Sequence, residues 1–217
     1  MQVPEYEGRL FSHLYGEFMR FGNQRLEIAD DEGLDIRFER MPADVRARIR
    51  DAVWTHPELL EQFIRDNPSH LTSAELALMS TWRHRVVGTF HVYRYLKTCT
   101  IFLDEDANGH AFGVLGLADP IDKVLEQWPL PAVVRTALLP LGEKIVYDGL
   151  MYRYSILADS GVTAQLDKRY RKIKSLEGII TSLPAPDFHV RRRPARKAVA
   201  AHNGHSGRKR RKQKARS

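Results

Sequence analysis

The spacing of apolar residues changes once along this 217-residue chain, close to Arg85. Before that point apolar side chains recur every three or four residues, as in Leu10, Leu14 and Phe18, which is the spacing of one helix face. After it, β-branched and aromatic residues dominate, as in the run 86–95, which favours strands. Helices followed by strands predict an α+β fold.

Four helices are expected before residue 85. The first covers 5–28, with Tyr6 at the start of its apolar stripe, and the second begins near Pro42. Two sequences, Thr55 to Glu58 and Thr72 to Glu75, place a hydroxyl and a carboxylate three residues apart, as in a capping box. They predict where the third and fourth helices begin.

Residues 86–182 have the pattern of six or seven strands joined mostly by short turns, with helices inserted at about 120–127 and 163–175. Asp119 is expected to cap the first of these helices. Asp148-Gly149 predicts a hairpin turn. Short turns imply antiparallel pairing, and closure into a barrel removes exposed edges. We therefore predict a helical lobe, then a mainly antiparallel, partly closed barrel-like sheet, then a disordered basic tail. The expected units are 1–85, 86–183 and 184–217.

The last 27 residues, 191–217, carry twelve basic side chains and no acidic one. Without these twelve of its 34 basic residues the chain has 22 basic and 27 acidic residues, so its net charge of +7 comes from the tail. The tail is nearly free of large apolar residues, which predicts disorder. Lysine and arginine on such a segment neutralise phosphates and release counterions, so we expect salt-sensitive binding to DNA, RNA or the ribosome.

The helix expected at 163–175 adds a second group of basic residues next to the tail, with Tyr170 among them. We expect Tyr170 to be buried with Leu166 and Ile173, and the charges to extend the phosphate-binding track. The candidate nucleic-acid-binding residues are Lys168, Arg169, Arg171, Lys172, Arg191, Arg192, Arg193, Arg196, Lys197, Arg208, Lys209, Arg210, Arg211, Lys212, Lys214 and Arg216.

Two other functions remain open at this point. The chain could be a protein–protein adaptor or regulator that uses the tail as a tether, or the tail could only add solubility or fold back on the acidic body. The second alternative is a metal-dependent nuclease that uses carboxylates near strand ends. Those carboxylates are Asp119, Asp122, Asp148 and Asp159. No Walker loop, GxSxG or GxGxxG sequence is present, so we favour a non-enzymatic protein without a cofactor.

Other potential sites have simpler structural explanations. The single cysteine, Cys99, lies in a strand-like run and is expected to be buried. The sequence from Asp104 to Gly109 matches the first half of a calcium loop, but Leu115 stands where a bidentate glutamate is needed, so a hairpin tip is expected. The strand histidines His84, His91 and His110 lack the spacing of zinc ligands.

The N-terminus and the hydropathy favour a cytoplasmic protein associated with the nucleoid or ribosome, or a nuclear one in a eukaryote. No apolar run approaches the ~20 residues that span a bilayer. Glu5 and Glu7 stand where a signal peptide would be basic and then apolar. We therefore expect nucleic acid as a partner, with a protein partner for the folded body, and no membrane.

Several segments resemble an uncharacterised prokaryotic family of hypothetical proteins. The resemblance covers about residues 8–183 and implies a prokaryotic origin, but it carries over no activity and no catalytic residue. The basic tail lies outside it. The segments that carry the resemblance are His56-Pro57-Glu58-Leu59-Leu60, Trp82-Arg83-His84, Gly113-Val114-Leu115-Gly116-Leu117, Leu138-Leu139-Pro140 and Ile145-Val146-Tyr147-Asp148-Gly149-Leu150.

Overall fold

The computed structural model describes residues 1–29, 38–106, 109–154 and 160–184, and its fold is α+β, as predicted. The basic tail, and with it the prediction of disorder, lies outside the described residues. The same holds for Asp159. The helices and the sheet belong to one compact unit.

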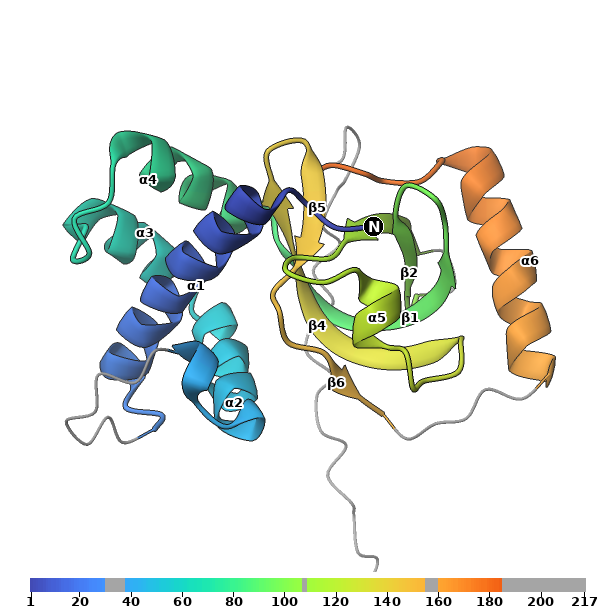
Figure 1. Cartoon of the computed structure of the whole chain (residues 1–217), viewed down its shortest axis with the longest axis horizontal. Coiled ribbons are helices and arrows are strands. Elements are labelled where there is room, and N and C mark those ends of the chain that lie inside the picture. The colour runs from blue at the N-terminus through green and yellow to red at the C-terminus, as the bar shows by residue number, and fades with distance from the viewer. Residues whose placement is uncertain (30–37, 107–108, 155–159, 185–217) are drawn as a thin grey trace, which may run out of the picture. The chain divides into compact units, whose positions relative to one another are not determined.

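The helices before the sheet lie together in one lobe, with α1 the longest of them (Figure 1). They are α1 (Glu5–Leu26), η1 (Phe38–Arg40), α2 (Ala43–Thr55), α3 (Glu58–Asp66), α4 (Ser73–Ser80) and η2 (Thr81–His84). In α1 the apolar stripe begins later than predicted, because Tyr6 is 71% exposed and Phe11 is the first buried aromatic residue.

One of the two predicted capping boxes is confirmed. The Thr72 hydroxyl accepts from the Glu75 N–H, and the Glu75 carboxylate accepts from the Thr72 N–H. The prediction at Thr55 is wrong. Thr55 is the last residue of α2, and its hydroxyl donates to the Ala52 carbonyl one turn back instead of capping α3.

Five strands close into a ring. The elements after residue 85 are β1 (Val86–Tyr95), β2 (Thr100–Asp104), β3 (Ala111–Leu115), α5 (Ile121–Val124), β4 (Ala132–Leu141), β5 (Lys144–Tyr147), β6 (Tyr152–Arg153) and α6 (Ser160–Leu176). Along the ring the order is β1-β2-β3-β5-β4, and β4 pairs again with β1. The β3–β5 pairing is parallel and the other pairings are antiparallel. The predicted barrel-like sheet is thus confirmed.

The predicted hairpin at Asp148-Gly149 is wrong, because the chain does not reverse there. Leu138 of β4 pairs with Val86 on one edge and with Tyr147 on the other. Val134 pairs in the same way with β1 and with Arg153. Strand β6 therefore continues along the β4 edge that β5 occupies, after an interruption in which the register slips by two residues. An insertion of this kind bends the strand and redirects its side chains.

The barrel interior and its two covered faces hold the core. Phe90 packs between Phe102 and Phe112 with ring centroids 6.1 and 6.0 Å apart, and all three are buried. The helical lobe packs on β4 and β5, where Ala137, Leu139 and Val146 join one hydrophobic cluster with the α1 side chains.

Helix α6 covers a different face of the barrel (Figure 1). Its Leu166, Tyr170 and Ile173 pack on Tyr93, Cys99, Ile101, Leu103 and Ala111 from β1, β2 and β3 and the turn between the first two. The buried stripe predicted for this helix is therefore confirmed, and so is the burial of Cys99.

Candidate functional site

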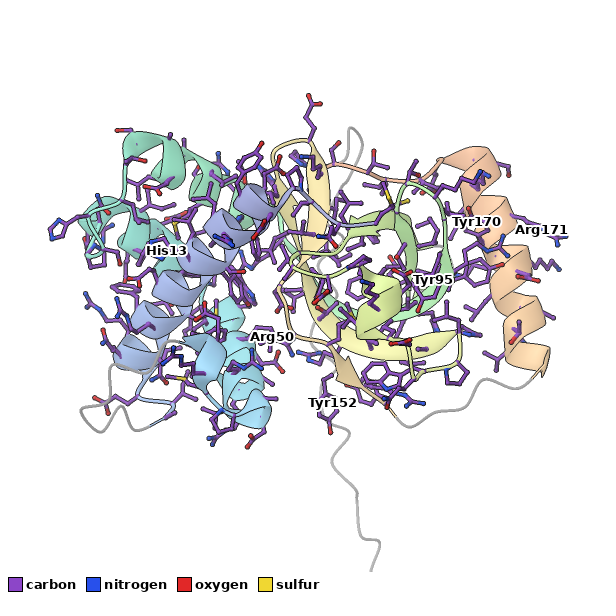
Figure 2. The ribbon with its side chains drawn as sticks, in the orientation of Figure 1. His13, Arg50, Tyr95, Tyr152, Tyr170 and Arg171 are labelled. Carbon is purple, nitrogen blue, oxygen red and sulfur yellow. The ribbon has the colours of Figure 1, made fainter. Side chains whose placement is uncertain are left out.

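Helix α6 presents a row of exposed basic side chains on the side away from the barrel. Lys168, Arg171, Lys172 and Lys174 are exposed, whereas Leu166, Tyr170 and Ile173 are buried. Figure 2 shows Tyr170 pointing toward the sheet and Arg171 away from it. We call these four residues the α6 basic face. A fixed row of cations at helical spacing suits phosphate groups.

Arg169, which the sequence placed in the same group, has another partner. Its guanidinium donates to the carbonyl and to the carboxylate of Asp104, the latter at 2.7 Å, and its side chain is 14% exposed. The Asp104 carboxylate also accepts from the His110 N–H at 3.0 Å. Arg169 therefore ties α6 to the tip of the β2–β3 hairpin, and Asp104 is engaged within the protein.

Arg94 is a basic residue that the sequence did not single out for this site. It lies near the end of β1, with its guanidinium 4.5 Å from the Tyr93 ring centroid and 5.3 Å from that of Tyr170. The Lys174 ammonium lies 5.9 Å from the same Tyr170 ring. Arg94 thus lies beside the α6 basic face, with its guanidinium also 3.6 Å from the Asp167 carboxylate of α6. No local sequence pattern links Arg94 to α6. The rings that bring β1 and α6 together, Tyr93 and Tyr170, are 77 positions apart.

A second polar site is buried between the helical lobe and the sheet. Arg50 of α2 and Asp148, which follows β5, form an ion pair at 3.4 Å, with side chains 1% and 0% exposed. Asp148 accepts from the Thr136 hydroxyl at 2.9 Å, the Leu150 N–H at 3.0 Å and the Tyr15 hydroxyl at 3.2 Å. Figure 2 labels Arg50 at this junction. The carboxylate predicted as a turn residue is in fact the centre of a buried network.

Burial and charge act in opposite directions on these groups. Burial raises the pKa of Asp148, while Arg50 and the three hydrogen bonds lower it, and the net direction is upward. Burial lowers the pKa of Arg50, but the charges of Asp148 and Asp51 raise it above the usual value. Burial, followed by the Asp148 charge, holds the pKa of Tyr15 well above its usual range. The Tyr15 hydroxyl therefore stays protonated and donates a hydrogen bond to Asp148.

Asp119, Asp122 and Asp148, the described members of the carboxylate set proposed for a nuclease, are not gathered into a metal site. Asp119 and Asp148 line the same cavity of about 200 Å³, next to Tyr147, whereas Asp122 lies 3.9 Å from the Met1 amino group. Among the described residues no group of three or more His, Cys, Asp or Glu side chains could hold a metal ion. Nor does Asp119 cap α5, whose first turn follows Pro120 without a side-chain cap.

A larger cavity of about 860 Å³ opens along α1. It is lined by side chains of both charge signs, including Arg9, Glu17, Arg20 and Glu39. Several of these are already paired, as in the contact of Arg20 with Glu17 at 2.5 Å. Its mixed charge does not indicate one class of ligand.

Comparisons with models of protein families, with curated proteins and with solved structures found no match. The resemblance to a prokaryotic family therefore stays a prediction. In the part of the chain that the structure describes, no helix is both long and apolar enough to cross a membrane.

Proposed function

We propose that this protein is a non-enzymatic nucleic-acid-binding protein in which the basic tail and the α6 basic face hold phosphates. The observation that carries the proposal is the separation of charge along the chain. Residues 191–217 carry twelve basic and no acidic side chains, while the remainder has an excess of acidic ones. A cationic arm on an acidic body seeks polyanions, and the body's own charge disfavours indiscriminate collapse onto them.

The α6 basic face supports the same proposal from the folded part. Lys168, Arg171, Lys172 and Lys174 lie on one helix, close in sequence to the tail, and all are exposed. Their positions are fixed because the opposite side of α6 is buried on the barrel and Arg169 is bound to Asp104. Binding by residues on a packed helix orders less backbone than binding by a flexible segment does, so it costs less conformational entropy.

The barrel topology bears on where the proposed contact lies. The strand order of the ring, the parallel pairing of β3 with β5 and the helix between β3 and β4 are features of the OB-fold, in which many proteins bind oligonucleotides or oligosaccharides. Such binding uses the outer face of the second and third strands, and here α6 covers that face. The contact we propose is therefore made by the outer side of α6. The likeness of topology is an analogy between folds and identifies no ligand.

The test is the salt dependence of binding to duplex DNA and structured RNA by the full chain and by two charge-matched variants. One variant replaces Lys168, Arg171 and Lys174 with glutamine. The control replaces the exposed arginines of the helical lobe, Arg40, Arg48 and Arg83, in the same way.

Each phosphate contact contributes about 0.7–0.9 to the slope of log affinity against log salt. We expect the α6 variant to lose about 2–3 from that slope and the control to keep it. Equal salt slopes in the two variants would show that the α6 basic face does not contact phosphates. Absence of binding by the full chain at low salt would contradict nucleic-acid binding as the function.

A further inference from the structure

Strand β6 carries an exposed aromatic surface beside basic side chains. The Tyr152 ring is 59% exposed, in a protein that buries most of its large aromatic residues. Tyr154, two residues on, packs edge-to-face on Tyr152 with ring centroids 5.7 Å apart. Alternate residues of a strand share one side, so the two rings form one surface. Figure 2 shows Tyr152 beside β6 at the margin of the sheet.

An arginine, Arg135, lies beside this pair of rings. Arg135 of β4 is the register partner of Tyr152. Its Nε donates to Asp51 at 3.1 Å, and its terminal nitrogens donate to no described residue. Arg153, between the two tyrosines, lies on the opposite side of the strand, where its guanidinium is 5.0 Å from the Trp128 ring centroid. Asp51, the acidic partner of Arg135, also accepts from Arg50 at 2.9 Å, so two guanidinium groups share its charge.

The position of the rings leaves them open to a ligand. Strand β6 pairs with β4 on one edge, and its other edge pairs with no strand in the described ranges. The rings do not belong to the face that α6 covers, whose core residues come from β1, β2, β3 and α6. An exposed ring packed on a half-buried one, with a guanidinium donor beside it, offers a stacking surface and an anion contact at one place. Unpaired nucleobases have a flat π-face next to a phosphate, which is the chemistry that fits both.

We infer that Tyr152 and Tyr154 form a stacking platform for the bases of single-stranded nucleic acid, with Arg135 contacting the adjacent backbone. The inference rests on the proposed function and adds a ligand class to it. The tail and α6 contact phosphates of any strand, whereas the platform selects strands whose bases are unpaired. Duplex bases are stacked on one another and cannot reach the rings.

The test compares three fluorescein-labelled ligands of equal length: a dT12 strand, an abasic strand with the same phosphates, and a duplex. The protein is the full chain, with Tyr152→Ala, Tyr152→Phe and the control Tyr6→Ala. Tyr6 is also highly exposed but lies on α1, so its variant matches the loss of a surface ring elsewhere. Circular dichroism confirms that each variant is folded.

Stacking of one base contributes about 1–3 kcal/mol, which corresponds to about a 5- to 150-fold change in affinity. We expect Tyr152→Ala to lose affinity for dT12 within that range, and to bind the abasic strand and the duplex as the parent does. Tyr152→Phe keeps the ring and should keep the affinity. Tyr6→Ala should bind all three ligands normally.

Two results would overturn the inference, and they are distinct. If the parent binds all three ligands and Tyr152→Ala binds dT12 equally well, the platform is wrong and the phosphate contacts stand. If the parent binds none of the ligands, the proposed function fails and the platform fails with it.

Discussion

Asp148 shows how one residue joins the two parts of the fold. Its carboxylate receives Arg50 and Tyr15 from the helical lobe and Thr136 from the sheet, all buried. A carboxylate so deeply buried is tolerated only because each oxygen has donors and a cation lies beside it. The network therefore fixes how the lobe meets the barrel.

Removing the cation from this network should destabilise the protein strongly. In Arg50→Met the Asp148 charge stays buried without its partner, and such changes cost about 3–5 kcal/mol. Urea unfolding measures the loss, with the exposed Arg83→Met as control. A loss below about 1 kcal/mol would mean that the pair contributes little to stability.

Tyr147 gives a prediction in the alkaline range. Burial, followed by the charges of Asp148 and Asp119, raises its pKa from 10.0 to about 12. Between these values the unfolded chain releases the phenolic proton and the folded chain keeps it, so stability falls as pH rises. The full shift corresponds to about 3 kcal/mol. Tyr147→Phe cannot ionise and should lose less stability than the parent between pH 8 and pH 11.

The urea midpoint at several pH values measures that difference. Tyr6→Phe, which alters an exposed ring, is the control. A Tyr147→Phe protein whose midpoint falls in parallel with that of the parent would contradict the assignment.

At the scale of elements, the packing of α6 on the barrel determines where its basic face lies. Besides the stripe of Leu166, Tyr170 and Ile173, polar contacts hold it on the barrel, among them Arg169 to Asp104 and the Tyr93 hydroxyl to Asp167. Hydrogen bonds to charged groups contribute about 1.5–3 kcal/mol each, less where solvent reaches them. Arg169→Met should therefore loosen α6 by about 1–2 kcal/mol while the barrel keeps its stability.

Amide hydrogen exchange separates these regions. We expect faster exchange in α6 of Arg169→Met and unchanged exchange in β1 and β4. The exposed Arg171→Met is the matched control, and it should leave α6 exchange unchanged. Equal exchange in α6 of the two variants would show that the apolar stripe alone holds the helix.

The elements that the sequence predicted well are those whose signal is local. Periodicity in α1, the Thr72 capping box and the stripe of α6 each depend on residues within a few positions, and each is confirmed. The register slip after Tyr147 has no local signal. Gly149 does adopt φ +79°, as a turn requires, but the strand continues along β4 because its pairing partner is set by the closed ring.

The candidate site divides in the same way. The α6 basic face could be predicted, because helical spacing separates exposed from buried residues on one helix. The tie of Arg169 to Asp104, the position of Arg94 and the network around Asp148 could not, since each joins residues 65 or more positions apart or depends on the barrel closing. The exposure of Tyr152 could not be predicted either, because tyrosine residues are found both buried and exposed.

At the scale of the whole molecule, two faces of the barrel are covered, and the basic side of α6 and the Tyr152 ring of β6 stay exposed. The helical lobe packs on β4 and β5, and α6 packs on β1, β2 and β3. The functional surface is therefore expected outside the barrel core, continuous in sequence with the tail. The phosphates of a bound strand would contact α6 and residues 191–217, and its unpaired bases would contact β6.

The most direct test is a salt titration of binding to duplex DNA and structured RNA by the full chain and by residues 1–190. The truncation keeps every described residue and removes all twelve basic residues of the tail. We expect the full chain to bind with a steep slope, and the truncation to bind weakly with a slope reduced to the few contacts of α6. Absence of binding by both proteins at ~50 mM salt, where phosphate contacts are strong, would contradict nucleic-acid binding as the function.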